Sequence, residues 1–246
     1  DDNIIDKAGY NFDIVIGGIN ENAPEDNQGP QIQLYMNDET FVDGGNTNAS
    51  PFLLAVLEDE NGINTSITAV DHDIVAVLDG DAGNPYILND FYQTELNDYT
   101  KGSAKFPFRN LKAGLHTVEL CAWDTYNNVS CATLTFVVVN DSEMVLDNVL
   151  NYPNPFVNYT EFWFNHNKPN ESLEVQVQIF TVSGKLVKTI NETVQSTGNL
   201  SRSVTWDGLD DFGDKIGKGV YVYKLNVRSV LSDVKAEKYE KLVILQ

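Results

Sequence analysis

Cysteine and histidine are the side chains here that could support nucleophilic catalysis, and the chain has two of the first and three of the second. Cys121 and His116 form the nearest such pair in sequence. Both fall in a run typical of a β-strand, where an offset of five places two side chains on opposite faces, so a local dyad is excluded. The chain also lacks a Gly-x-Ser-x-Gly elbow, a phosphate-binding loop and a His-Glu-x-x-His motif. We therefore expect no catalytic residue and no bound cofactor.

The other two histidines give weaker signals. His166 lies between two asparagines near the end of a predicted strand, and we expect it to be an exposed polar side chain. His72 lies between two aspartates, where it could orient a loop or help to bind a metal. A single histidine among scattered carboxylates lacks the ligand spacing of a zinc site, so we assign no metal ligand.

Two aspartate-rich segments, residues 79–84 and 207–214, offer clustered hard oxygen atoms. Neither follows the twelve-residue calcium loop that ends in glutamate. Aspartate and glycine also dominate ordinary turns. Turns are the simpler interpretation of both segments, and calcium binding stays an open alternative.

The two cysteines are better explained as a disulfide. Residues 116–122 and 132–139 form a predicted hairpin in which Glu119 faces Thr133, and Cys121 faces Cys131, on the outer side. The other side is then largely apolar and contains His116, Val118, Leu120, Ala132, Leu134 and Phe136. A slip of one residue would invert every side chain. Because directly opposed Cβ atoms lie within disulfide reach, we expect a bond in an oxidising compartment, with two free thiols as the alternative.

The elements that must position these residues are short β-like runs separated by asparagine, aspartate and glycine, with no convincing helical period. The run 171–180 alternates most regularly, with Leu173, Val175 and Val177 pointing one way, as in a half-buried antiparallel strand. The predicted fold class is all-β, with two immunoglobulin-like antiparallel β-sandwich domains in tandem.

The chain divides at two polar segments. We expect residues 1–18 to be the end of a preceding domain, 19–29 to be a linker, 30–142 to be an immunoglobulin-like sandwich and 143–246 to be a second sandwich. Charge supports the division, because the formal net charge of −20 is concentrated in residues 1–142, which hold 23 acidic and 5 basic side chains.

The net charge and the apolar runs of the chain argue against two classes of function, nucleic-acid binding and spanning a membrane as a helix. A body of this charge repels phosphate backbones, so we expect no nucleic-acid binding. No run has the ~18–20 apolar residues of a membrane-spanning helix. A solvated acidic surface is the simpler explanation of the charge, and binding of divalent cations near an anionic cell surface is the alternative.

Four blocks follow one another in the C-terminal part: Asn151–Phe156, Gln178–Lys185, Trp206–Gly213 and Gly217–Leu225, before the apolar run Leu242–Leu245. In this order they resemble the C-terminal sorting domain of type IX secretion cargo. They also resemble the related immunoglobulin-like domain of the flagellar hook-cap protein. Both resemblances imply a module for addressing and docking.

Further blocks lie in residues 20–141: Gly29-Pro30, Leu34–Asp38, Asp59–Thr65, His72–Ile74, Ala122–Asp124 and Asn127-Asn128. Together with the C-terminal blocks they resemble the gingipain-type cysteine sortases of type IX secretion. The similarity runs from about Gly17 to the C-terminus. The sorting-domain blocks alone are shared by many unrelated cargo proteins, so they indicate the pathway only.

The resemblance implies a parent that cleaves cargo sorting signals and joins the new carboxylate to surface lipopolysaccharide by Cys/His acyl transfer. Its catalytic domain would precede Asp1, so no catalytic residue carries over. The implied partners are an outer-membrane β-barrel carrier (PorV-like) and other type IX components. The implied location is the cell surface, at the outer leaflet of the outer membrane, after passage through the periplasm.

The terminal segment is the candidate docking site. From Glu237 to Leu245 both faces of the alternating pattern become apolar, which normally requires cover on both sides. A C-terminal strand is also a candidate sheet edge that could add to a partner. We therefore assign docking to Leu242, Val243, Ile244 and Leu245, with burial in the chain's own sandwich as the alternative.

Two other functions stay open. The chain could be the C-terminal modules of a secreted surface adhesin or hydrolase that carries a type IX sorting signal. It could also be a hook-cap scaffold, favoured only by Trp206–Gly208 and Gly219–Tyr221. Residues upstream of Asp1 would separate these functions, because a caspase-like domain there would indicate the sortase.

Overall fold

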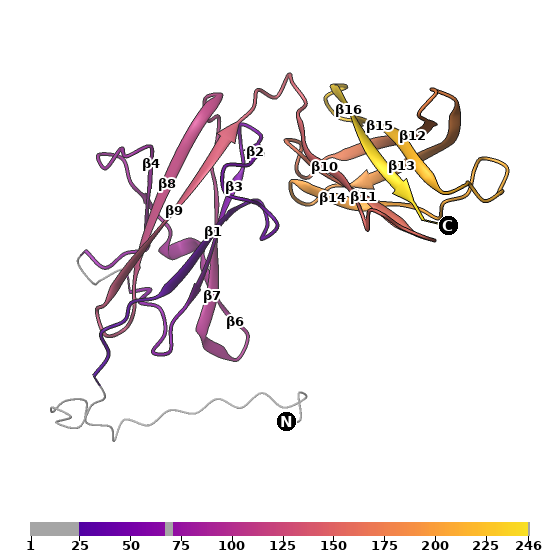
Figure 1. Ribbon diagram of the computed structural model, residues 1–246. Helices are drawn as coiled ribbons and strands as arrows, with labels where there is room; N and C mark the ends of the chain where they lie inside the picture. The colour runs from indigo at the N-terminus through magenta and orange to yellow at the C-terminus, as the bar shows by residue number, and fades with distance from the viewer. Residues whose placement is uncertain (1–24, 67–70, 246) are drawn as a thin grey trace, which may run out of the picture.

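The computed structural model describes residues 25–66 and 71–245, and Figure 1 shows that they form two β-sandwiches. The expected end of a preceding domain at 1–18 lies outside the described residues, as does most of the expected linker at 19–29. Within the described ranges there is no α-helix, and the predicted all-β class with antiparallel sandwiches is confirmed. Among these residues, no helix has the length and apolar character needed to cross a bilayer.

The first sandwich consists of two sheets built from β1 to β9. One sheet has the order β1-β3-β7-β6, with strands Gln31–Met36, Phe52–Glu58, Asp98–Pro107 and Tyr92–Glu95. The other has the order β2-β9-β8-β4-β5, with strands Asn46–Thr47, Val129–Val138, Gly114–Trp123, Val75–Leu78 and Tyr86–Ile87. A short 3-10 helix, Asn89–Phe91, precedes β6. All pairings are antiparallel except β2 with β9.

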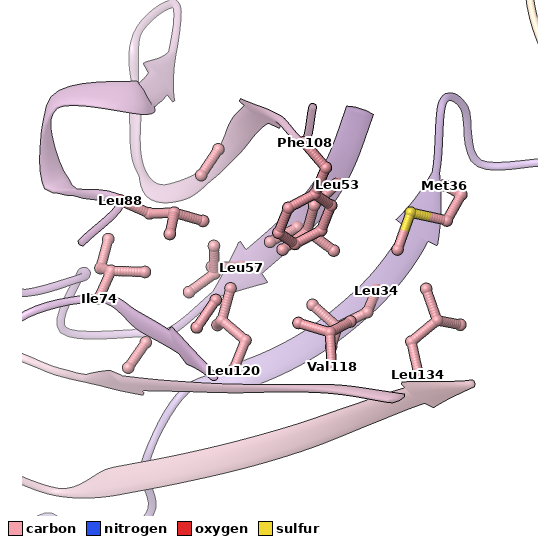
Figure 2. Packing of buried hydrophobic residues seen from close by; sticks show 14 of the residues in the cluster. Leu34, Met36, Leu53, Leu57, Ile74, Leu88, Phe108, Val118, Leu120 and Leu134 are labelled. Atoms are coloured by element: carbon pink, nitrogen blue, oxygen red, sulfur yellow. The ribbon is translucent and has the colours of Figure 1, made fainter. Parts of the chain in front are cut away.

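The core of this sandwich follows from the alternation in its strands. Figure 2 shows Leu34, Leu53 and Leu57 of one sheet facing side chains of the other. The opposite sheet contributes Val118, Leu120 and Leu134, which are all buried. Because successive side chains on a strand point to opposite faces, one apolar set per strand suffices to close the core.

The hairpin of β8 and β9 confirms the predicted register. His116 lies opposite Phe136, Val118 opposite Leu134, and Cys121 opposite Cys131. A disulfide joins the two cysteines on the outer side of the sheet. The apolar residues therefore point into the core, and the bond lies outside it.

The second sandwich has a three-stranded sheet, β10-β11-β14, with strands Leu146–Tyr152, Thr160–His166 and Leu200–Trp206. It packs on a four-stranded sheet, β13-β12-β15-β16, with strands Leu186–Gln195, Ser172–Thr181, Gly219–Ser229 and Lys235–Ile244. The predicted alternation in β12 is confirmed, because Leu173, Val175 and Val177 are all buried. Phe162 packs edge-on against Tyr223, with 4.9 Å between ring centroids, and so joins the two sheets.

Candidate functional site

The side chains with catalytic potential are all engaged in structural contacts. The disulfide leaves neither Cys121 nor Cys131 as a free thiol. His116 Nδ1 lies 2.7 Å from Asp79 Oδ2, and its Nε2 lies 2.7 Å from the carbonyl oxygen of Lys112. Its ring also stacks on Phe136. The two hydrogen bonds connect β8 to Asp79, which follows β4, and to the loop that precedes β8.

The expectation that His166 is exposed is wrong. Only 1% of the residue is accessible: Ser196 and Asn199 of the loop before β14 are bonded to it, and β2 of the first sandwich lies near β11. Burial lowers the pKa of the ring to about 4. No local pattern indicates this burial, because the residues that cover His166 are far away along the chain.

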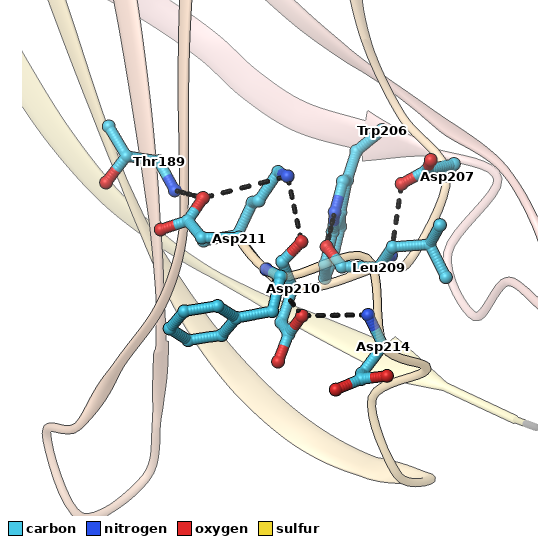
Figure 3. A network of polar contacts seen from close by, with 9 residues as sticks. Thr189, Trp206, Asp207, Leu209, Asp210, Asp211 and Asp214 are labelled. Atoms are coloured by element: carbon cyan, nitrogen blue, oxygen red, sulfur yellow. Dashed lines mark hydrogen bonds and ion pairs between the residues drawn. The ribbon is translucent and has the colours of Figure 1, made fainter.

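Two aspartates of 207–214, Asp207 and Asp210, accept backbone N–H groups within their own loop, as Figure 3 shows. Asp210 Oδ1 accepts the backbone N–H groups of Phe212 and Asp214, each at 2.9 Å. Asp211 Oδ1 lies 3.6 Å from Lys188 Nζ, which ties the loop to β13. The 79–84 segment is similar, with Asp81 accepting the N–H of Gly83 and the side-chain amide of Asn84. Turn formation accounts for both segments.

One carboxylate cluster was not predicted from sequence. Asp26, Asp59 and Asp124 each place a carboxylate oxygen within 4.8 Å of the others. Burial raises the pKa of Asp59, and the negative charges of Asp124 and Asp26 add to the effect. Asp124 accepts the N–H groups of Tyr126 and Asn128, so loop formation accounts for its position. The three aspartates lie too far apart in sequence for any motif to connect them.

The structure separates the four predicted docking residues into two pairs. Leu242 and Ile244 are 0% and 1% exposed and belong to the core of the second sandwich. Val243 is half-buried, and Leu245 is 58% exposed. Alternation along β16 is the reason, because only one face of the strand points away from the core. Leu242 and Ile244 are therefore unavailable to a partner while the sandwich is intact.

The outer edge of β16 is not free near the C-terminus. The Phe156 N–H donates to Val243 O at 3.0 Å, and the Leu245 N–H donates to Phe156 O at 2.9 Å. Asn154 continues this cover with two side-chain hydrogen bonds, to Lys241 O and from the Val243 N–H. Phe156 itself is buried against Trp206. The expected edge for strand addition is thus already occupied over residues 241–245.

An apolar strip crosses the outer face of the four-stranded sheet beside the C-terminus. It consists of Phe180, Val220, Val222, Val243 and Leu245. Val220 lies opposite Val243, and Phe180 lies opposite Val222, so the strip runs across three neighbouring strands. Val220 is 49% exposed. Side chains of this kind on an outer face can bind an apolar surface of a partner.

The other half of the same face is polar. Lys224 Nζ lies 2.6 Å from Glu237 Oε2, and the Arg228 guanidinium lies 2.7 Å from both Glu174 and Asp233. Five charged side chains of this half are therefore paired with one another. Within the apolar strip, Val220 and Leu245 are exposed and the other three residues are half-buried.

Comparisons with known proteins support this part of the chain as an immunoglobulin-like module. Residues 158–230 match the family model of the FlgD Ig-like domain. Among curated proteins, none matches the chain.

Solved structures with similarity include dimeric latent PorU from Porphyromonas gingivalis, at 32% identity and a TM-score of 0.46. That match covers 89% of this chain and 20% of the PorU chain, so the chain spans one fifth of PorU's length. The fibronectin(III)-like modules of Clostridium thermocellum CbhA match at 8% identity, with 87% and 93% of the two chains covered and a TM-score of 0.32. The chain is therefore similar to PorU over most of its length, and residues 158–230 match the FlgD Ig-like domain.

Proposed function

We propose that this chain is the non-catalytic immunoglobulin-like part of a PorU-like type IX sortase, serving its export and its docking on an outer-membrane β-barrel carrier. The 32% identity to PorU over 89% of the chain supports this function, because it includes both sandwiches. Residues 30–142 would be a spacer, and residues 143–246 would be the sorting domain. Cleavage of cargo sorting signals and transfer to lipopolysaccharide would belong to a catalytic domain elsewhere in the parent, at the outer leaflet.

The apolar strip is the observation that carries the docking role. It adjoins the C-terminus and exposes valine and leucine beside a polar half-face that contains the ion pairs of Lys224 and Arg228. Burying such side chains against a partner releases about 25 cal/mol per Å² of apolar surface. Docking therefore rests on Val243 and Leu245, together with Val220 from the neighbouring strand. Leu242 and Ile244 act indirectly, by holding β16 in the sandwich.

The test replaces strip residues without disturbing the sandwich. The double substitution Val220→Thr and Val243→Thr keeps β-branched side chains and removes apolar surface from the outer face. We expect less of the full-length parent to co-purify with the carrier barrel from outer membranes, and less to reach the cell surface. Surface protease accessibility and quantitative immunoblotting measure both effects.

Val129→Thr is the matched control. Val129 is 47% exposed, close to the 49% of Val220, but lies in the first sandwich. The control should leave export and co-purification unchanged, and circular dichroism should show all variants folded. Normal export and carrier binding of the folded strip variant would overturn the docking role.

A further inference from the structure

The two sandwiches meet at a junction in which buried asparagines are hydrogen-bonded to one another. Asn199, just before β14, accepts a hydrogen bond from Asn37 Nδ2 at 2.7 Å. Its own Nδ2 lies 3.0 Å from Asn46 O in the first sandwich and 2.8 Å from His166 O in the second. Asn37 and Asn199 are 5% and 3% exposed. Asn199 is therefore bonded to both sandwiches at once.

Close packing accompanies these bonds. A Cβ atom at Gly198 would lie 1.6 Å from Asp38 Oδ2 of the first sandwich, so a side chain at this contact would displace the Asp38 carboxylate. Asn46 also bonds to Asp147 of β10. The loop carrying Gly198 and Asn199 must therefore hold its present position for the junction to stay closed.

His166 is connected to that loop by hydrogen bonds within the second sandwich. Its Nδ1 accepts the backbone N–H of Lys168 at 3.2 Å, so the hydrogen of the neutral ring lies on Nε2. Nε2 then donates to Ser196 Oγ at 3.3 Å, and the Ser196 hydroxyl donates to Gly198 O at 2.6 Å. The neutral imidazole is thus the first member of a chain of hydrogen bonds that ends at the junction loop.

We propose that His166 is an acid-sensitive latch, and that protonation of its ring releases the contact between the two sandwiches. The added proton would lie on Nδ1, directed at the Lys168 N–H that this atom now accepts. Two donors cannot face each other at hydrogen-bond distance. The ring must therefore turn or become solvated, and Ser196, Gly198 and Asn199 lose their support.

The charged groups around the ring do not relieve the repulsion between a protonated Nδ1 and the Lys168 N–H. Lys168 is buried and donates from Nζ to Asp141 O, so it adds positive charge on the same segment. Asp38 lies beyond Gly198, and Asp147 is bonded to Asn46. Neither carboxylate bonds to the ring while the junction is closed. An imidazolium could approach Asp38 only after the loop moves, which favours opening.

The sign of the effect follows from the lowered pKa of about 4 in the closed state. A histidine exposed by opening has its ordinary pKa of about 6.5, so opening is coupled to proton uptake. The closed junction has its full stability above about pH 6.5, the ordinary histidine pKa, and becomes less stable as the pH falls toward about 4, the pKa of the closed state. This pKa difference allows the open-to-closed ratio to rise up to about 300-fold.

The test measures the distance between spin labels on the two sandwiches. Leu96 and Leu231 are exposed, one in each sandwich, and Leu96→Cys with Leu231→Cys can be labelled while the native cysteines remain bonded. Wild-type protein should give a narrow distance distribution at pH 7.5 that broadens by pH 4.5. His166→Gln, which cannot be protonated, should stay narrow over that range.

Two further variants separate the latch from general acid effects. Gly198→Ala should broaden the distribution at every pH, because the added methyl group collides with Asp38. His116→Gln, a histidine substitution away from the junction, should behave as wild type. A narrow wild-type distribution at pH 4.5 would overturn the proposal. So would equal broadening in His166→Gln, or loss of the second sandwich's circular dichroism signal at the same pH as the broadening.

Discussion

Two leucines three residues apart at the C-terminus should respond very differently to the same substitution. Leu242 is fully buried, whereas Leu245 is 58% exposed on the opposite side of the strand. We expect Leu242→Ala to destabilise the second sandwich strongly and Leu245→Ala to leave it nearly unchanged. The pair therefore distinguishes a folding role of the terminal strand from a docking role.

The magnitudes follow from the burial of each side chain. Leu242 lies opposite Tyr221 and packs in the core cluster that includes Phe156 and Ile244. We expect this cluster to collapse only partly around the cavity that a truncated side chain would leave. Its truncation should cost about 3 kcal/mol, within the ~2–5 kcal/mol range for buried leucine. Truncating Leu245 removes side-chain surface that water largely reaches already, and should cost less than about 1 kcal/mol.

Hydrogen exchange of β15 measures the difference directly. The backbone of β15 is paired with β16 from Gly219 to Arg228, which is all of the strand except its last residue. A loss of about 3 kcal/mol should speed exchange of these amides roughly 100-fold in Leu242→Ala. Leu245→Ala should show wild-type exchange. Equal exchange rates in the two variants would refute the assignment of the two faces of β16.

Two other substitutions test the first sandwich. Replacing Cys121 and Cys131 with serine opens a loop with a sequence separation of 10 and should cost about 2–3 kcal/mol in the chain-entropy model, seen as a lower urea midpoint; an unchanged midpoint would contradict this. Asp124→Ala removes a buried carboxylate that accepts the backbone N–H groups of Tyr126 and Asn128, and should cost about 2 kcal/mol. It should also lower the pKa of Asp59 by removing a neighbouring negative charge, and NMR titration showing no decrease would contradict the cluster.

The alternation of apolar and polar side chains along the chain was sufficient to predict the register of the β8–β9 hairpin and the inward face of β12. The register of β8 on β9 followed from sorting apolar and polar side chains, because any odd slip would bury Glu119 and Thr133. The inward face of β12 followed in the same way. The apolar character of the last residues was also visible in sequence, which is why the terminal segment was assigned to docking.

Contacts between segments that are distant in sequence determined the features that alternation does not predict, namely the burial of His166 and the cover of the β16 edge. His166 is bonded to Asn199, and Asn199 is bonded to Asn37 and Asn46 in the other sandwich, more than 150 residues away, so no local pattern indicated the junction. The side-chain amide of Asn154 and the backbone groups of Phe156 cover the edge of β16 that the sequence predicted to be free, and neither contact follows from the apolar pattern of β16 itself. Periodicity reports which face of a strand is apolar. It does not report what covers a strand's edge or its end, because that depends on how whole sheets pack in space.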